Sequence, residues 1–336
     1  MNQNNLTPLV SLCTPTFNRR PFIPYMIKCF QHQTYSKYNI EWIIIDDGTD
    51  KIEDMVTNIP QVKYFYYKDK MELGEKRNLM HSKCSGDIII YMDDDDYYPP
   101  ERISHAVQML QDNPTFLIAG SSEMHIYFDN RKEIYQCGPY AKYHATAATF
   151  AFRKELLEQT NYDNNITFGE ENKFTKKYTI PLLQLDTLKT IFVCSHKHNS
   201  LNKERLLENI DTNKFVNKST YSISDFIKDP ILKQFYILDM DKLLSNYTQG
   251  NPENKPKLMK QIQIKEQELE TRQKQIDTQQ NQQIDTQQID TQQTVTDIQH
   301  KYEKKITEQT ILINELLKKV KYLSNELLKY KSQSPT

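Results

Sequence analysis

Short apolar segments alternate with longer segments of mixed polarity along the first three-fifths of the chain. Four segments have the β-branched or aromatic composition and the flanking turn residues of buried strands: residues 9–13, 42–45, 62–67 and 88–92. Three segments between them suit helices with one apolar face: residues 21–33, 51–59 and 74–84. This alternation predicts an α/β domain over residues 1–210, with a mainly parallel sheet flanked by helices.

The composition of the chain changes after this domain. Residues 211–248 contain a helical pattern and are expected to form a helical appendage. Residues 249–299 are nearly all polar, with Gln, Asp, Thr and Lys dominant and a repeated IDTQQ unit whose spacing breaks a heptad. We expect this segment to be an extended or weakly helical linker.

Residues 300–331 regain a regular apolar pattern with steps of three and four, typical of a coiled coil. Its members are Ile306, Ile313, Leu316, Val320, Leu323, Leu327 and Tyr330. The pattern predicts a homo-oligomer that associates through residues 306–330, with its oligomeric state left open. The alternative is a single amphipathic helix that folds back on the first domain.

Composition narrows the possible classes of function. The chain has 43 Lys and Arg against 44 Asp and Glu, so its formal net charge of −1 argues against a general nucleic-acid binder. Its five cysteines are scattered without a CxxC pair, which favours reduced buried thiols over a disulfide framework or a zinc site. We find neither a signal-peptide pattern nor an apolar run of membrane-spanning length, and therefore expect a cytoplasmic protein.

The strongest chemical signal is the acidic run Asp93-Asp94-Asp95-Asp96, which directly follows a predicted buried strand and precedes two prolines. Four adjacent carboxylates repel one another, so such a loop needs a compensating cation. Mn²⁺ or Mg²⁺ bridging carboxylate and phosphate oxygens would meet that need and neutralise a nucleotide diphosphate. The alternative is an exposed acidic turn, which a position after a buried strand disfavours.

Two further polar clusters follow predicted strands. Thr14-Pro15-Thr16 comes after the first strand, and Asp46-Asp47-Gly48 comes after the second. The carboxyl ends of parallel strands meet at one edge of a sheet, where ligands bind in such folds. A carboxylate there can accept hydrogen bonds from a base or a ribose hydroxyl, although Asp-Gly after a strand is also an ordinary turn.

The motifs after these strands, taken in order, resemble those of family 2 glycosyltransferases of the GT-A fold. The resemblance begins with Thr14-Pro15-Thr16-Phe17-Asn18-Arg19 and continues, in order, through Asp46-Asp47-Gly48, Gly74-Glu75-Lys76-Arg77-Asn78, Gly86-Asp87-Ile88 and the Asp93–Asp96 loop. It covers about residues 8–205. It implies a Rossmann-like GT-A domain with a mixed, mainly parallel sheet, and an inverting transferase that uses a nucleotide-sugar and a divalent cation.

The resemblance also implies roles for particular residues. Side chains expected near the nucleotide-sugar are Thr14, Thr16, Asp46, Asp47, Arg77, Asp93 and Asp94. The expected metal ligands are Asp95, Asp93 and His196, with Asp96 as a supporting charge. His196 is the better match to a late H-x-x-N-[ST] element, and His198 is the alternative; an imidazole ligand suits Mn²⁺ better than Mg²⁺.

The catalytic base is expected in Phe168-Gly169-Glu170-Glu171-Asn172, which resembles the Glu-Asp motif of the family. An inverting transfer needs one carboxylate to take the proton of the acceptor hydroxyl. Glu171 is favoured, with Glu170 as the alternative. An acidic helix N-terminus would explain the same residues without catalysis.

The sequence therefore predicts a metal-dependent hexosyltransferase that moves a sugar, from a UDP-sugar by preference, to a hydroxyl of a glycan, protein or small molecule. Trp42 is the only tryptophan, so the Q-x-x-R-W motif of processive synthases is absent and a non-processive enzyme is expected. One alternative is a sugar-nucleotide nucleotidyltransferase, disfavoured because residues 13–20 contain no glycine. The other is a catalytically silent coiled-coil scaffold.

Overall fold

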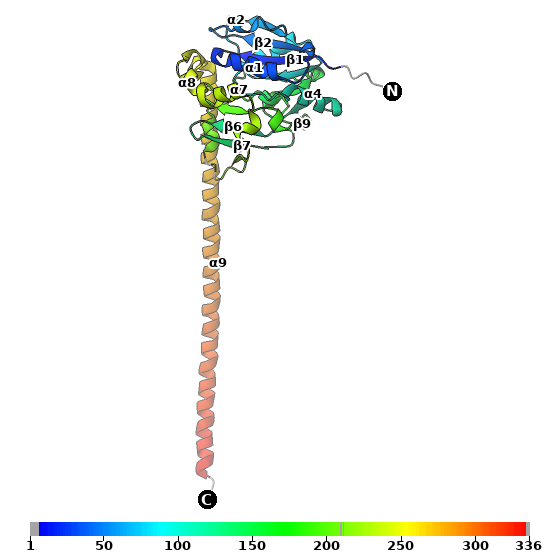
Figure 1. Ribbon diagram of the computed structural model, residues 1–336. Helices are drawn as coiled ribbons and strands as arrows, with labels where there is room; N and C mark the ends of the chain where they lie inside the picture. The colour runs from blue at the N-terminus through cyan, green and yellow to red at the C-terminus, as the bar shows by residue number, and fades with distance from the viewer. Residues whose placement is uncertain (1–6, 209, 211, 334–336) are drawn as a thin grey trace, which may run out of the picture. The chain divides into compact units, whose positions relative to one another are not determined.

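The computed structural model describes residues 7–208, 210 and 212–333 (Figure 1). Its internal contacts divide the chain into a first unit that ends at Gln263 and a second that begins at Ile264. Within the described part of the chain, none of the helices combines the length and the apolarity that crossing a membrane requires.

The first unit is built on a seven-stranded sheet with the order β3-β2-β1-β4-β8-β5-β9. The strands are β1 (Val10–Thr16), β2 (Ile40–Asp46), β3 (Val62–Tyr66), β4 (Ile88–Tyr91), β5 (Ile118–Gly120), β8 (Ala151–Arg153) and β9 (Leu182–Gln184). Strands β3, β2, β1 and β4 run parallel, whereas β8 is antiparallel to both of its neighbours. This confirms the expected mixed, mainly parallel sheet and its first four strands.

Helices connect the parallel strands and cover the sheet. They are α1 (Ile23–His32), α2 (Glu53–Val56), α3 (Leu73–Lys83) and α4 (Arg102–Asp112). Alternate residues of the central strands enter two separate cores, with Leu12 and Ile44 in one and Cys13 and Ile45 in the other. Because both faces are buried, these strands consist of continuous apolar runs, which is why the sequence revealed them.

A second sheet of four short strands has the order β10-β6-β7-β11 and was not predicted. Its strands are β6 (Met124–Phe128), β7 (Glu133–Cys137), β10 (Val193–Ser195) and β11 (Val216–Lys218). An isolated bridge between Tyr97 and Phe192 links the segment before β10 to the end of the acidic loop. Strand β10 thereby carries His196 towards the carboxyl edge of the main sheet.

Short helices follow within the region 211–248 and lie in the first unit. They are α6 (Ile223–Phe226), α7 (Pro230–Gln234), the π-helical turn η7 (Phe235–Asp239) and α8 (Met240–Ser245). The Tyr236 hydroxyl donates a hydrogen bond to the Asp96 carbonyl oxygen at 2.9 Å, and the Phe235 ring stacks on Tyr25 at 3.5 Å. These helices therefore support the acidic loop directly.

Short segments of 3₁₀ helix complete the first unit. Those not discussed further are η1 (Arg20–Phe22), η2 (Lys37–Asn39), η3 (Ala147–Thr149), η4 (Lys154–Glu158), η5 (Thr187–Lys189), η6 (Lys203–Leu207), η8 (Thr248–Gly250) and η9 (Pro252–Asn254). The four-residue helix α5 (Glu171–Phe174) carries the expected catalytic base at its first position.

The chain ends in one continuous helix, α9 (Pro256–Gln333). The extended or weakly helical linker expected over residues 249–299 is therefore helical from Pro256 onward. The physical reason is that residues 257–333 contain neither Gly nor Pro and are rich in Gln, Lys and Glu, which favour helix. All the predicted coiled-coil residues lie on this helix. The side chain of one of them, Tyr330, is outside the described residues.

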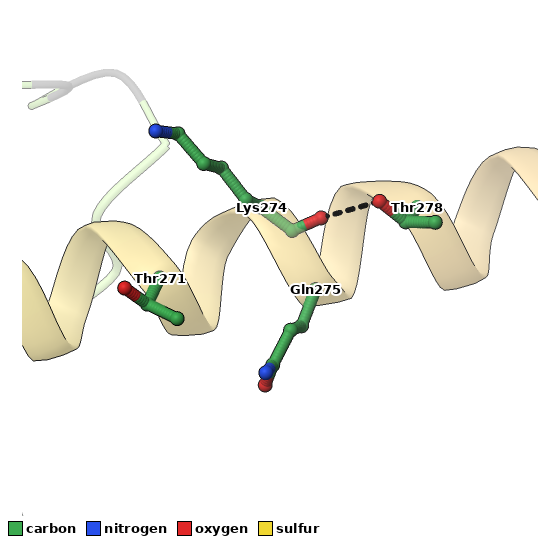
Figure 2. A pocket seen from close by; sticks show the side chains of 4 residues that line it. All are labelled: Thr271, Lys274, Gln275 and Thr278. Atoms are coloured by element: carbon green, nitrogen blue, oxygen red, sulfur yellow. Dashed lines mark hydrogen bonds between the residues drawn. The ribbon is translucent and has the colours of Figure 1, made fainter.

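Figure 2 shows a surface hollow on α9 that is lined by Thr271, Lys274, Gln275 and Thr278. All four residues come from the same helix, and the Thr278 hydroxyl donates a hydrogen bond to the Lys274 carbonyl oxygen at 2.7 Å. A single helix cannot surround a ligand, so we do not treat this hollow as a candidate site.

Candidate active site

Three polar loops converge at the carboxyl edge of the main sheet, as predicted. The register pairs Thr16 of β1 with Asp46 of β2, and Cys13 of β1 with Tyr91 of β4. The loop after β1, the Asp46–Asp47 pair and the acidic loop after β4 therefore leave the sheet side by side. This arrangement follows from parallel pairing, which puts the carboxyl ends of the strands at one edge.

The acidic loop is largely buried rather than exposed. Burial raises the pKa of Asp93, Asp94 and Asp96, and that of Asp94 reaches about 7. Burial would also raise the pKa of Asp95, but its contact with His196 and the charge of Arg19 lower it below its ordinary value. A cluster with three raised carboxyl pKa values is one in which added positive charge would be strongly favourable.

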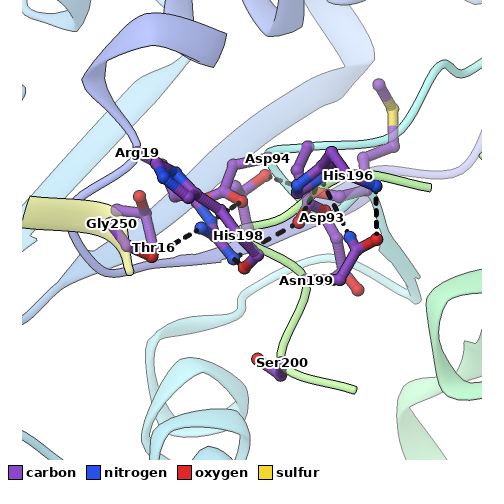
Figure 3. A network of polar contacts seen from close by, with 12 residues as sticks. Thr16, Arg19, Asp93, Asp94, His196, His198, Asn199, Ser200 and Gly250 are labelled. Carbon is purple, nitrogen blue, oxygen red and sulfur yellow. Dashed lines mark hydrogen bonds and ion pairs between the residues drawn. The ribbon is translucent and has the colours of Figure 1, made fainter. Parts of the chain in front are cut away.

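Arg19 is the principal cation beside this loop (Figure 3). Its guanidinium lies 3.5 Å from the Asp94 carboxylate and 3.4 Å from that of Asp95. It also donates hydrogen bonds to the carbonyl oxygens of His198, at 2.8 Å, and Gly250, at 3.4 Å. From the sequence, Arg19 is only the last residue of the Thr14–Arg19 motif, without a role of its own.

His196 lies beside the acidic loop, whereas the His198 ring lies near Gly250 and Tyr247. The His196 Nε2 atom is 3.3 Å from the Asp95 Oδ2 atom and 2.9 Å from the Asn199 Nδ2 atom. Burial lowers the pKa of His196 to about 4, so its imidazole is neutral at pH 7, the form that binds metals. His198 packs against Gly250, where an added Cβ atom would lie 2.7 Å from the imidazole Nδ1 atom.

The expected trio of Asp93, Asp95 and His196 does not form a ready-made metal cage. No group of three or more His, Cys, Asp or Glu side chains in the described residues is arranged to hold a metal ion. Asp93 instead faces Arg77, whose guanidinium is 3.6 Å from its carboxylate. The structure thus brings together two of the three expected ligands and pairs the third with a buried cation.

The remaining donor set still fits a divalent ion bound jointly with a ligand. One buried carboxylate oxygen each of Asp93, Asp94 and Asp96 has no hydrogen-bond partner among the described residues. They lie in the same loop as the Asp95–His196 pair. Ions such as Mg²⁺ are commonly held by one or two protein carboxylates while substrate phosphates and water supply the other ligands. Two close protein ligands are therefore sufficient for such a site.

Arg77 of α3 connects the acidic loop to the segment of the expected catalytic base. Its side chain is only 2% exposed and lies over the Tyr91 ring, 4.3 Å from the ring centroid. The Arg77 Nε atom donates a hydrogen bond to the Glu170 Oε1 atom at 2.9 Å. The expected contact of Arg77 with a nucleotide stays a prediction, whereas the structure shows that Arg77 bridges Asp93 and Glu170.

The two glutamates differ in their surroundings. Glu170 is buried and occupied by Arg77, whereas Glu171 begins α5 and is half-buried. Burial, and secondarily the charge of Glu170, raises the pKa of Glu171 to about 7. A carboxyl group with this pKa can exchange a proton near neutral pH, as a general base must.

The polar residues after β1 and β2 are engaged inside the protein. The Thr14 hydroxyl donates to the Met92 carbonyl oxygen at 2.7 Å. The Asp46 carboxylate accepts hydrogen bonds from the Gly48 amide and the Tyr64 hydroxyl, at 2.8 and 2.7 Å. These contacts shape the loops.

Asp47 and Thr16 are likewise part of the internal structure. The Asp47 carboxylate pairs with Lys76 of α3 and accepts a hydrogen bond from the Met71 amide at 2.7 Å. Lys76 also donates to the Thr16 carbonyl oxygen at 2.8 Å, and the buried Thr16 side chain lies near the Asp94 carboxyl. Whether these residues touch a nucleotide remains a prediction.

The segment before α9 adds a lysine, Lys255, that no motif in the sequence indicates. The Lys255 Nζ atom is 3.3 Å from the Ser200 hydroxyl and 5.7 Å from the centroid of the Phe17 ring. Burial, and secondarily the charge of Arg19, lowers the pKa of Lys255 to about 7. Asn18 anchors this segment by donating to the Gln249 carbonyl oxygen at 3.0 Å. Gly250 offers a partial sequence signal, because a Cβ atom there would lie 2.9 Å from the Asn18 carbonyl oxygen.

Comparison with known proteins identifies the family of this domain. A family model described as glycosyl transferase family 2 matches residues 11–180, half of the chain. An uncharacterized glycosyltransferase of Rickettsia typhi is 31% identical over 111 residues, covering 33% of this chain and 34% of the relative. The abequosyltransferase of Salmonella typhimurium is 28% identical over 131 residues, which cover 37% of this chain and 36% of that relative. The chain thus spans about a third of the length of these relatives.

Among solved structures, the chain is similar to S. aureus TarS in complex with UDP-GlcNAc. The TM-score is 0.44, with 17% identity and coverage of 55% of this chain and 58% of the other.

Proposed function

Because this chain belongs to glycosyl transferase family 2, we propose that it is a metal-dependent, inverting, non-processive glycosyltransferase. It moves a sugar from a nucleotide-sugar, by preference a UDP-sugar, to an acceptor hydroxyl. The observation that carries this proposal is the single polar network that links the Asp95–His196 pair through the acidic loop and Arg77 to the Glu170–Glu171 segment. A donor site and a proton acceptor are thereby held in one framework.

Asp95 and His196 would hold the divalent ion, Mn²⁺ or Mg²⁺. When bound, the ion neutralises the charge that develops on the leaving diphosphate. Arg19 already lies against the acidic loop, and Lys255 stands nearby. Both side chains can turn towards phosphate oxygens once other positive charge compensates the carboxylates. Thr14, Thr16, Asp46, Asp47, Asp93 and Asp94 are proposed to shape or contact the nucleotide.

Glu171 takes the proton of the acceptor hydroxyl as the new bond forms. The acceptor oxygen attacks the anomeric carbon, the bond from that carbon to the phosphate oxygen breaks, and the nucleoside diphosphate leaves with the bonding electrons. The Glu170 carboxylate accepts a hydrogen bond from the Arg77 guanidinium and is therefore less available to accept a proton. Arg77 and Glu170 therefore hold the base segment in place, while Glu171 performs the transfer.

A donor screen tests this proposal. We expect UDP- or GDP-sugars together with Mn²⁺ to raise the melting temperature of the full chain, and a matching nucleoside diphosphate to be released on turnover. Absence of a metal-dependent shift with every donor would favour the silent scaffold. Release of pyrophosphate from a nucleoside triphosphate would favour the nucleotidyltransferase.

Outside the first unit, we propose that the protein is a homo-oligomer held together through residues 306–330. The support is the apolar pattern of this segment, whose described apolar side chains are exposed.

A further inference from the structure

The C-terminal part of α9 presents a row of exposed apolar side chains. Six of them are each between 54% and 62% exposed: Ile306, Ile313, Leu316, Val320, Leu323 and Leu327. Large aliphatic side chains are rarely left in water at this density along one line. The described residues of the second unit, which contains only this helix, do not cover them.

The spacing of the row is that of a coiled coil. Ile306, Ile313, Val320 and Leu327 recur at intervals of seven residues, and Leu316 and Leu323 lie three residues after two of them. These are the a and d positions of a heptad. A straight helix repeats every 3.6 residues, so a strict repeat of seven keeps its apolar line only where helices wind around each other. The pattern therefore calls for another helix rather than a flat surface.

The residue types at the a and d positions indicate how many helices associate and in which orientation. β-Branched residues occupy three of the four a positions and leucines occupy two d positions, a combination that favours two parallel strands. Gln309 occupies the preceding d position. In a parallel, in-register pair it meets its own copy and the two amides can bond, whereas antiparallel pairing would set it against an apolar position.

Farther upstream, beyond Tyr302 and Val295 at d positions, the same heptad frame turns polar. Thr271 and Thr278 fall at a positions, and Lys274 falls at the d position between them. Polar side chains at these positions do not stabilise the association of two helices. Association is thereby confined to the distal part of α9.

We propose that residues 306–327 form a parallel, in-register, two-stranded coiled coil with the same residues of a second copy of this chain. The pairing is independent of nucleotide and metal, so it holds whether or not the proposed transferase activity does. Each molecule then carries two copies of the candidate active site.

Two isoleucines give a matched test in the full chain. Ile313 and Ile311 are 56% and 57% exposed on the same helix, but Ile313 is at an a position and Ile311 faces away at f. Sedimentation equilibrium should report twice the 39.9 kDa chain mass for the wild type and for Ile311→Asp. Ile313→Asp should raise the dissociation constant by about 100-fold or more, since each of two buried carboxylates costs at least about tenfold.

Cross-linking tests the orientation. The five native cysteines are all buried in the first unit, so Gln309→Cys supplies the accessible thiol. With glutathione disulfide as oxidant, this variant should form a covalent dimer much faster than Thr307→Cys, whose side chain lies at a b position. Equal rates for the two variants would overturn the parallel register.

Other results would also overturn the proposal. They are a mass of one, three or four chains for the wild type, or an equal effect of Asp at positions 311 and 313. Binding of the wild-type monomer to phosphatidylserine vesicles, lost with Ile313→Asp, would assign the row to a membrane surface instead.

Discussion

Replacing Glu171 with Gln separates the proposed catalytic role of this residue from its effect on stability. The folded protein holds the pKa of Glu171 at about 7, against an ordinary value of 4.5, mainly because the carboxyl is buried and secondarily because Glu170 is near. The proton is thus bound more tightly in the folded state. Stability falls as the pH rises from about 4.5 through 7, and the whole cost of ionisation is present above pH 7.

The free-energy cost of ionising Glu171 in the folded protein follows from the difference between its folded and ordinary pKa values. A difference of about 2.5 pKa units corresponds to about 3 kcal/mol, an upper limit because partial contact with solvent screens the charge. Glu171→Gln removes the charge and keeps the shape. The variant should therefore be more stable than the wild type at pH 8 and nearly equal to it at pH 4. Its turnover should fall by about 10²- to 10⁴-fold, as expected for loss of a general base.

Two assays measure the two effects. Denaturant unfolding at pH 4, 6 and 8 gives the stability difference, and release of nucleoside diphosphate gives turnover. Wild-type turnover should also rise with pH through about 7 as Glu171 loses its proton. Turnover in Glu171→Gln equal to that of the wild type would refute the role as base. A stability gain that does not change with pH would refute the electrostatic reasoning.

Glu170→Gln is the matched control, and its stability effect has the opposite sign. Removing the Glu170 carboxylate leaves the buried Arg77 guanidinium with Asp93, at 3.6 Å, as its ion-pair partner among the described residues. Breaking one side of a buried ion pair costs about 3 kcal/mol or more. The same chemical substitution at adjacent positions should therefore stabilise the protein at residue 171 and destabilise it at residue 170.

Three further variants probe the rest of the site. Asp95→Asn should abolish the Mn²⁺-dependent thermal shift with nucleotide-sugar; an unchanged shift would place the metal elsewhere. Arg77→Lys keeps the charge but loses the fork that reaches Asp93 and Glu170, so turnover should fall by roughly 10- to 100-fold while calorimetry shows little change in nucleotide affinity. Lys255→Met should weaken nucleotide diphosphate binding by roughly 10- to 100-fold in calorimetry, whereas the exposed Lys260→Met should not.

Local patterns were sufficient for the central part of the fold. Strands β1, β2 and β4 were predictable because burial on both faces demands mainly apolar runs, and the partly exposed β3 was predictable from its β-branched and aromatic residues. Their parallel order places the polar loops that follow at one edge, so Asp46 and the Asp93–Asp96 loop could be brought together from sequence alone. The short strands of the second sheet were missed because three to five residues carry too little periodicity.

The partners inside the site were decided by tertiary structure. Arg77 and Glu170 are 93 positions apart, and Arg19 and the His198 carbonyl are 179 apart. Such pairs depend on how distant segments pack, which local composition does not encode. The same holds for Asp93, whose carboxylate pairs with Arg77 and not with the Asp95–His196 pair.

The sequence by itself determined the acidic loop, the strand-helix order that presents it, and the heptad row of α9, since each depends on neighbours along the chain. Tertiary structure alone decided which cation faces which carboxylate. It also decided that His196 rather than His198 reaches Asp95, and that Lys255, from a segment beyond the family match, lies close by. The physical reason is that charge pairing acts through space, and only the folded chain fixes those distances.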